Sequence, residues 1–156
     1  MPPPDTAASA PLLRPRDPAC PPLPARRPDD WSVRFERTTL PIHRPPTREA
    51  ATLATSCAGR EPPCQAVAPA DHDALYAAFQ QRGFSGDWEV NAPGYRSPHH
   101  GSRELSARWG GSECRVHDGR ATGVDPAHEQ DFEDLRSALL ATLERAQSKA
   151  SPAASR

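Results

Sequence analysis

The chain has 156 residues, 20 of them proline, and its 19 Lys and Arg residues against 20 Asp and Glu residues give a formal net charge of −1. Leu, Ile, Val and Phe are scarce, which is typical of disordered chains, but the high net charge that usually accompanies disorder is absent. The balanced charge argues against bulk electrostatic binding to nucleic acid, and no apolar run is long enough to cross a membrane. The length predicts one small domain, and we expect a monomer.

The N-terminal part of the chain is rich in proline. Residues 1–29 combine Pro, Ala, Arg and Asp without hydrophobic periodicity, so they cannot bury enough apolar area to offset the entropy lost on ordering. We predict a disordered arm with polyproline II character, which serves as a tether and whose removal up to residue 28 leaves stability nearly unchanged. A single domain then occupies 30–147, and residues 148–156 form a flexible tail.

Three strands are predicted after the arm. Apolar and polar residues alternate over 31–39, which indicates a half-buried strand. A connection broken by prolines follows at 40–46. Residues 48–56 are interpreted as a second strand, and 65–68 as a short third one.

The first helix has clear signals at both ends. Pro69 suits the first helical position because its missing N–H has no partner there, and Asp71 favours the positive end of the helix dipole. Leu75 and Phe79 belong to an apolar stripe. Gly83 predicts a left-handed residue that ends the helix, with Phe84 packing back on the last turn.

A long connection and a hairpin come next. Residues 85–103 are interpreted as a loop rich in Gly, Pro and Ser, which Trp88 and Tyr95 pin to the domain. Residues 105–109 and 112–117 then predict two strands joined by a two-residue Gly-Gly turn. The predicted register pairs Leu105 with Val116, Ser106 with Arg115, Ala107 with Cys114, Arg108 with Glu113 and Trp109 with Ser112. It places the apolar side chains on one face.

The last element is a helix. Asp125 and Pro126 give its N-terminal signals, apolar residues recur at helical spacing, and the helix is expected to run to about Gln147. The order of elements predicts an α+β domain: a small antiparallel sheet of about five strands, with two helices packed on one face.

The motifs around these elements resemble those of a known group. They are the Asp-Trp-Ser-Val-Arg-Phe strand, the Leu-Pro break, the helix that starts with Pro-Ala-Asp-His-Asp and ends with Gly-Phe, and the Gly-Gly hairpin. Together they resemble a loose group of small bacterial α+β proteins of unknown function, many of them exported or lipoprotein-like. The resemblance implies the same fold and implies no functional residue.

Four cysteines leave the redox state and the compartment open. Cys57 and Cys64 enclose six residues of a predicted turn, and we predict that they form a disulfide; unpaired thiols in a reducing cytoplasm are the alternative. Six intervening residues do not match the usual spacing of a zinc site. Cys114 is expected in the core as a small free hydrophobe, and Cys20 as free, paired or lipidated. No signal-like apolar stretch is visible at the printed start, so we expect a periplasmic or exported protein if an upstream signal is missing, and a cytoplasmic one otherwise.

Three histidines are the candidates for a metal site. His99 and His100 lie in the long loop and His117 lies on the hairpin, but adjacent loop histidines seldom bind one ion without orienting carboxylates. We interpret them as solvated side chains, and the Asp71-His72-Asp73 run as part of a first helical turn. No phosphate-binding loop or nucleophile elbow is present, so we expect no catalytic, cofactor or metal site.

These observations predict a bacterial accessory or binding domain without enzymatic activity and without a cofactor, with an unidentified protein as a candidate partner. Two alternatives stay open. One is a small metal- or thiol-dependent enzyme that uses the histidines of the 85–103 loop. The other is an inhibitor or immunity-type module that binds a protein through an exposed sheet edge or through that loop.

Overall fold

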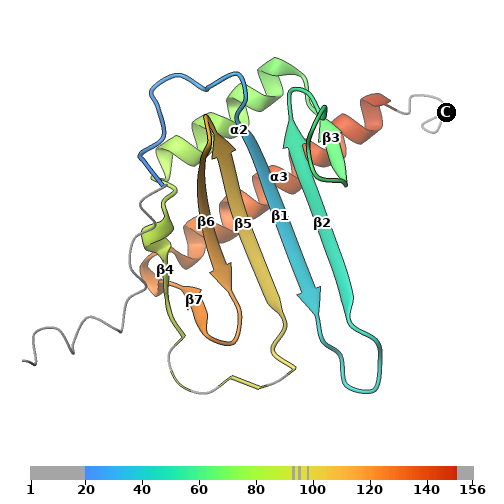
Figure 1. Cartoon of the computed structure of the whole chain (residues 1–156), viewed down its shortest axis with the longest axis vertical. Helices are drawn as coiled ribbons and strands as arrows, with labels where there is room; N and C mark the ends of the chain where they lie inside the picture. The colour runs from blue at the N-terminus through green and yellow to red at the C-terminus, as the bar shows by residue number, and fades with distance from the viewer. Residues whose placement is uncertain (1–19, 93, 95, 98, 151–156) are drawn as a thin grey trace, which may run out of the picture.

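The computed structural model describes residues 20–150, except residues 93, 95 and 98. In chain order its elements are β1 (Ser32–Thr39), β2 (Thr47–Ala54), β3 (Cys64–Ala66), α2 (Pro69–Gln81), the 3-10 turn η2 (Gly86–Trp88), β4 (Glu89–Asn91), β5 (Ser102–Trp109), β6 (Ser112–Asp118), β7 (Thr122–Val124), the 3-10 turn η3 (Pro126–His128) and α3 (Glu129–Ala150). Both long helices lie behind one face of a five-stranded sheet, and the other face is uncovered (Figure 1). The predicted α+β class is confirmed.

The main sheet has the strand order β3-β2-β1-β5-β6. The pairs β1–β2, β1–β5 and β5–β6 are antiparallel, but β3 runs parallel to β2, so the sheet is mixed and not purely antiparallel as we expected. The parallel pair needs no helical crossover because Cys64 lies beside Thr52, only two residues back from the end of β2. A connection over 55–63 is long enough for that return.

The β5–β6 hairpin has the predicted register. Leu105 pairs with Val116, and Ala107 pairs with Cys114. These four side chains are almost fully buried against the helices. Because side chains alternate along a strand, the next residue in each case faces the uncovered side of the sheet.

The predicted end of α2 is also confirmed. Gly83 has a φ of 65°, and its N–H donates to the carbonyl of Gln80 at 3.0 Å. The N–H of Phe84 donates to the carbonyl of Phe79 at 3.1 Å, and their rings lie 5.1 Å apart. These two hydrogen bonds form a Schellman motif, which satisfies carbonyls that the helix itself leaves free.

Helix α3 follows the predicted cap. The Asp125 side chain accepts a hydrogen bond from the N–H of Ala127 at 3.0 Å, and η3 begins with Pro126. The helix extends to Ala150, so residues 148–150 belong to it and not to the predicted tail. The rest of that tail, 151–156, lies outside the described residues.

The predicted loop over 85–103 contains regular structure. It includes η2 and β4, and β4 pairs with β7 in a second, two-stranded sheet that we did not predict. Trp88 is 1% exposed, so its predicted role as an anchor is confirmed, whereas Tyr95 lies outside the described residues. Glu89 is buried and accepts a hydrogen bond from the backbone N–H of His117 at 2.7 Å. This contact covers part of the outer edge of β6.

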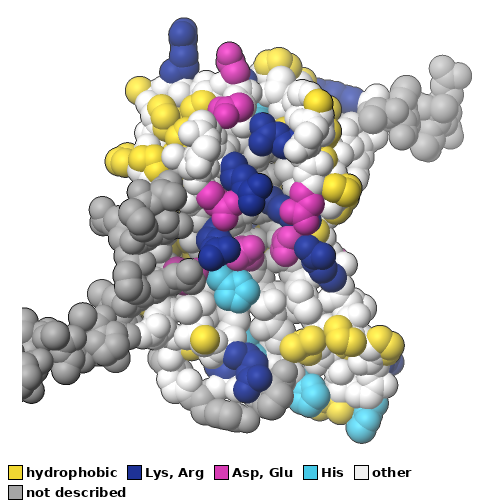
Figure 2. Space-filling model, viewed as in Figure 1, with side chains coloured by type: hydrophobic (Ala, Val, Ile, Leu, Met, Phe, Trp, Pro, Cys, Tyr) yellow, Lys and Arg dark blue, Asp and Glu magenta, His cyan; other side chains and the backbone are white. Residues whose placement is uncertain are grey.

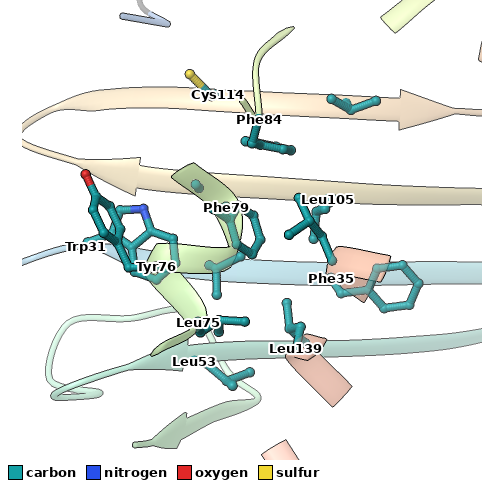
Figure 3. Packing of buried hydrophobic residues seen from close by; sticks show 14 of the residues in the cluster. Trp31, Phe35, Leu53, Leu75, Tyr76, Phe79, Phe84, Leu105, Cys114 and Leu139 are labelled. Atoms are coloured by element: carbon teal, nitrogen blue, oxygen red, sulfur yellow. The ribbon is translucent and has the colours of Figure 1, made fainter. Parts of the chain in front are cut away.

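The core lies between the sheet and the two helices (Figure 3). Trp31 is fully buried, and its ring centroid lies 4.9 Å from that of Tyr76 and 5.4 Å from that of Phe79. Figure 3 shows Trp31 and Tyr76 at one end of this layer and Phe35 at the other. The aliphatic and aromatic residues of the core are Val33, Leu53, Leu75, Leu105, Val116, Phe132, Leu135 and Leu139, among others.

The C-terminal part of the predicted arm packs on the domain. We call residues 20–28 the N-terminal segment. The Tyr76 hydroxyl donates to the Pro24 carbonyl at 2.5 Å, and Arg27 forms an ion pair with Asp73 at 2.6 Å. The domain therefore begins earlier than residue 30. Removal of residues 1–28 is no longer expected to leave the stability nearly unchanged. Residues 1–19 lie outside the described residues.

All four cysteines are paired. Cys57 is joined to Cys64 with 5.8 Å between their Cα atoms, as predicted. Cys114 is buried as expected, but it is not free: it is joined to Cys20, with a Cα–Cα distance of 4.8 Å and a sequence separation of 94 residues. The sequence left this pairing open because Cys20 fell in the arm, whose path no local pattern predicts.

Among the helices of the described residues, none is both long enough and apolar enough to cross a bilayer.

Candidate functional site

The helix-facing side of the sheet changes character along its strands. One cross-strand row contains Phe35, Leu105 and Val116, all buried. The next row on the same side, two residues further along each strand, contains Arg37, Arg103 and Asp118. The sheet thus continues beyond its apolar core with charged side chains, and a cleft opens there.

This cleft has a volume of about 340 Å³. It lies between the charged row, the first turns of α3 and the residues that precede β5. Its lining residues are Phe35, Arg37, Thr38, Thr39, Leu40, His99, His100, Gly101, Ser102, Arg103, Asp118, Glu133 and Arg136. We call it the Arg37 cleft.

Arg103 joins three carboxylates at the base of the Arg37 cleft. Its Nε lies 2.7 Å from Asp118 Oδ2, its Nη2 lies 2.6 Å from Glu129 Oε1, and its Nη1 contacts Glu133. Its guanidinium also lies 4.5 Å from the centroid of the Phe132 ring. Each nitrogen of this guanidinium contacts a carboxylate, which uses three of its five N–H donors, so Arg103 is the structural centre of the cluster.

These contacts change the ionisation of the group. Burial acts to lower the pKa of Arg103, but hydrogen bonds and charges from Asp118 and Glu129 outweigh it and raise the pKa above its ordinary value. Burial acts to raise the pKa of Asp118, but the bonds from Arg103 and Arg96 lower it overall. The pKa of Glu133 is lowered against burial in the same way, first by its bond to Arg103. Arg103, Asp118 and Glu133 are therefore all charged at neutral pH.

Arg96 attaches the preceding loop to this cluster. Its Nη1 lies 2.7 Å from Asp118 Oδ1 and donates to the carbonyl of Gly119 at 2.6 Å. A Cβ on Gly123 would lie 2.7 Å from Arg96 Nη2, so a larger residue there would displace the end of the Arg96 side chain. His100 Nε2 lies 3.2 Å from Arg96 Nη1.

Gly101 brings the loop against β1. It has a φ of 73°, and a Cβ at this position would lie 2.7 Å from the Thr38 carbonyl oxygen. The left-handed backbone and the close approach both require glycine. The adjacent His99 and His100 are thereby placed at the rim of the Arg37 cleft.

Arg37 differs from the other cations of the cleft. It is exposed and lies directly opposite Arg103 in the β1–β5 register. Its side chain forms no hydrogen bond or ion pair with any other described residue, and Glu49, opposite it on β2, is not in ion-pair contact. Arg136 uses only part of its guanidinium. Its Nε lies 3.1 Å from Glu133 Oε2, and its guanidinium carbon lies 5.9 Å from the Phe35 ring centroid.

The three candidate metal ligands do not meet. His99 and His100 line the Arg37 cleft, whereas His117 points from the opposite face of the sheet, where its Nδ1 lies 3.5 Å from Glu104 Oε1. The hydrogen bond with Glu104 raises the pKa of His117. Over the described part of the chain, no group of three or more His, Cys, Asp or Glu side chains is placed to hold a metal ion.

The Asp71-His72-Asp73 run has structural roles. Asp71 pairs with Lys149 at 3.1 Å, and Asp73 pairs with Arg27. His72 is fully buried against Trp31, with 5.0 Å between ring centroids, and its Nδ1 lies 3.0 Å from Thr55 Oγ1. Burial lowers the pKa of His72 to about 4, so the ring is neutral in the folded protein.

The uncovered face of the sheet carries a band of basic and acidic side chains across its middle (Figure 2). It has a shallow polar hollow of about 170 Å³. Arg34 in this hollow donates to Thr52 Oγ1 at 2.5 Å and pairs with Glu36 at 2.8 Å. Arg108 pairs with Glu113, as the predicted register required. Arg115 is exposed and forms no contact of this kind with other described residues.

The sequence interpretation missed Arg37, Arg103 and Asp118 as a group. The signal was present, since these residues continue the predicted inward-facing positions of their strands. Hydrophobic alternation does not reveal it, because the alternating apolar residues end before these charged positions. No sequence pattern links Arg96 to Asp118, because the loop that carries Arg96 is positioned only by tertiary contacts.

No protein-family model, curated protein or solved structure matches the chain. The resemblance to small bacterial α+β proteins therefore stays an expectation.

Proposed function

We propose that this protein is a binding domain without enzymatic activity, and that the Arg37 cleft holds a small anionic ligand. The observation that carries the proposal is the state of Arg37. A like-charged neighbour directly across a strand pair destabilises a sheet, yet Arg37 stands opposite Arg103 and forms no ion pair with a described residue. The charge of Arg103 is balanced by its carboxylate partners, so an anion in the cleft would supply the partner that Arg37 lacks among the described residues.

The surroundings of Arg37 support an anion and not a cation. The two carboxylates of the cleft, Asp118 and Glu133, already accept hydrogen bonds from arginines. Free donors remain on Arg37 and on the terminal nitrogens of Arg136. Preformed donors of this kind recognise carboxylate or phosphate oxygens.

The enzyme alternative has less support. A metal-dependent reaction would use several ligands on one ion, and His117 lies on the other face of the sheet from His99 and His100. A thiol-dependent reaction needs a thiolate, and the four cysteines form two disulfides.

Binding of a protein by addition of a strand to the sheet also has less support. Glu89 and the β4–β7 pair cover part of the β6 edge. The opposite edge strand, β3, has only three residues. Short or covered edges are poor templates for strand addition.

The two disulfides lead us to propose an oxidising compartment outside the cytoplasm. Mass spectrometry of alkylated, unreduced protein from the native cell tests this. We expect no alkylated cysteine. Full alkylation of Cys20 and Cys114 in the native protein would place it in a reducing compartment and contradict the proposal.

Anion binding is tested by NMR titration of the oxidised full chain with sodium acetate and with sodium phosphate, at constant ionic strength held by sodium chloride. We expect saturable chemical-shift changes at residues 37–40 and 99–103 with at least one of the two anions. In Arg37→Gln the affinity should fall by about tenfold or more, since a charge-assisted hydrogen bond is lost.

Arg115→Gln is the matched control. Arg115 is also exposed and unpaired among the described residues, but it lies on the opposite face of the sheet. The Arg115→Gln variant should bind acetate and phosphate with the affinity of the wild type. Equal affinity of Arg37→Gln and wild type for every anion would rule out the proposed site.

A further inference from the structure

The balance of charge and apolar surface in the Arg37 cleft identifies a class of ligand, and this inference rests on the proposed function. Three arginines and two carboxylates line the cleft, namely Arg37, Arg103, Arg136, Asp118 and Glu133. The formal excess is therefore one positive charge. Arg96 and Glu129, which contact the same cluster from outside the lining, add one charge of each sign. Glu49, opposite Arg37 on β2, is outside the lining and forms no ion pair with Arg37.

One uncompensated positive charge matches a monoanion. A dianion such as phosphate would bring a second negative charge close to Asp118 and Glu133, which are both held ionised by their arginine partners. Like charges in a partly desolvated cleft repel strongly. A carboxylate, by contrast, can accept two parallel hydrogen bonds from the planar guanidinium of Arg37.

The cleft also has an apolar wall. Phe35 closes it on the core side, where its ring is 4% exposed, and the half-buried Leu40 borders it at the end of β1. The volume of about 340 Å³ is far larger than a carboxylate needs. Binding sites of this size usually bury an apolar part of the ligand beside a few polar anchors.

We propose that the ligand is a monocarboxylate whose apolar group is a short alkyl chain or an aryl ring. Its carboxylate binds Arg37, and its apolar group lies against Leu40 and Phe35. The ligand is held and not transformed. The single excess positive charge favours the carboxylate, and the apolar wall favours the apolar group.

Isothermal titration calorimetry of the oxidised full chain tests the class with four probes at one ionic strength: hexanoate, acetate, hexanamide and inorganic phosphate. Hexanoate should bind about tenfold or more tightly than acetate, because it buries additional methylene groups. Its affinity should also exceed that of hexanamide, which has the chain but no charge, and that of phosphate, which has charge but no chain, by a similar factor.

Two variants separate the two halves of the ligand. Arg37→Gln should weaken hexanoate and acetate by the same factor, whereas Leu40→Ser should weaken hexanoate alone. Arg115→Gln should change neither. Leu40 is half-buried and Arg37 is exposed, so both variants are expected to fold, and circular dichroism checks this.

The remaining outcomes distinguish this inference from the proposed function. If phosphate or acetate binds through Arg37 as tightly as hexanoate, anion binding stands and the ligand class is wrong. If hexanamide equals hexanoate, the carboxylate is not recognised and the inference is overturned. If none of the probes binds in a manner that depends on Arg37, both proposals fail together.

Discussion

The two ends of the helix-facing side of the sheet use the same strands for different purposes. At one end, which we call the Trp31 end, the ring of Trp31, directly before β1, packs almost fully buried against the rings of Tyr76 and Phe79 on α2. At the other, the Arg103 end, the same alternation of β1, β5 and β6 presents Arg37, Arg103 and Asp118.

The difference teaches how a small domain makes room for a site. Burial of apolar side chains stabilises the Trp31 end in proportion to the area removed from water. At the Arg103 end, charged groups hold one another in fixed positions while keeping one side open to solvent, and a cleft results. The first end supplies stability, and the second supplies the cleft for which we propose a binding role.

The largest expected effect is at the Trp31 end. Trp31→Ala should lower the free energy of unfolding by about 4 kcal/mol, because it removes a fully buried ring from a packed cluster. Urea unfolding followed by circular dichroism measures this. Ile42→Ala, at a site 61% exposed, is the control and should change stability little. A loss below about 1 kcal/mol for Trp31→Ala would contradict the assignment of this end.

Removal of the N-terminal segment should also affect the Trp31 end. Deletion of residues 1–28 removes the Cys20–Cys114 disulfide and the contacts to Tyr76 and Asp73, and should cost about 3 kcal/mol. Deletion of residues 1–19 alone is the comparison, and thermal unfolding of the two truncated proteins measures the difference. Equal melting temperatures would mean that the segment does not stabilise the domain.

Arg103→Met tests the charged end. It leaves Asp118 and Glu133 without their main partner in a half-buried position, and we expect a loss of roughly 2 to 3 kcal/mol. Arg108→Met, on an exposed ion pair with Glu113, should cost under about 0.5 kcal/mol. Denaturant unfolding of both variants at neutral pH compares them, and similar losses would show that the Arg103 cluster has no special structural role.

His72 makes the Trp31 end sensitive to acid. Its pKa is about 4 in the folded protein against 6.5 for the model imidazole, so the unfolded chain binds the proton more readily. The stability is therefore complete above pH 6.5 and falls as the pH decreases toward 4, by about 2 kcal/mol between pH 7.5 and pH 5. Urea unfolding at these two pH values measures it. His72→Leu should reduce the difference, and an unchanged difference would exclude His72 as its cause.

The smallest expected effect on stability is that of Arg37→Gln. Arg37 is exposed and unpaired among the described residues, so its loss should change the free energy of unfolding by less than about 0.5 kcal/mol while it weakens anion binding. Paired unfolding and binding measurements on one preparation test this separation. A large loss of stability would show that Arg37 has a structural partner and would weaken the case for a binding role.

Much of the fold could be predicted because its signals are local. The register of the β5–β6 hairpin follows from alternation and a Gly-Gly turn, and the end of α2 follows from Gly83 and Phe84. The candidate site could be predicted only in part. His99 and His100 do lie at the cleft, but Arg37 and Arg103 were overlooked and His117 lies on the other face.

The helices, the long strands and their buried faces follow from local sequence signals, because hydrophobic period and capping residues act within a few positions. The parallel pairing of β3, the β4–β7 sheet, the Cys20–Cys114 bridge and the Arg37 cleft arise only when the chain packs. Each of these joins residues that are distant in the chain or segments of three residues. Such contacts depend on how the larger elements first pack, and no local preference specifies them.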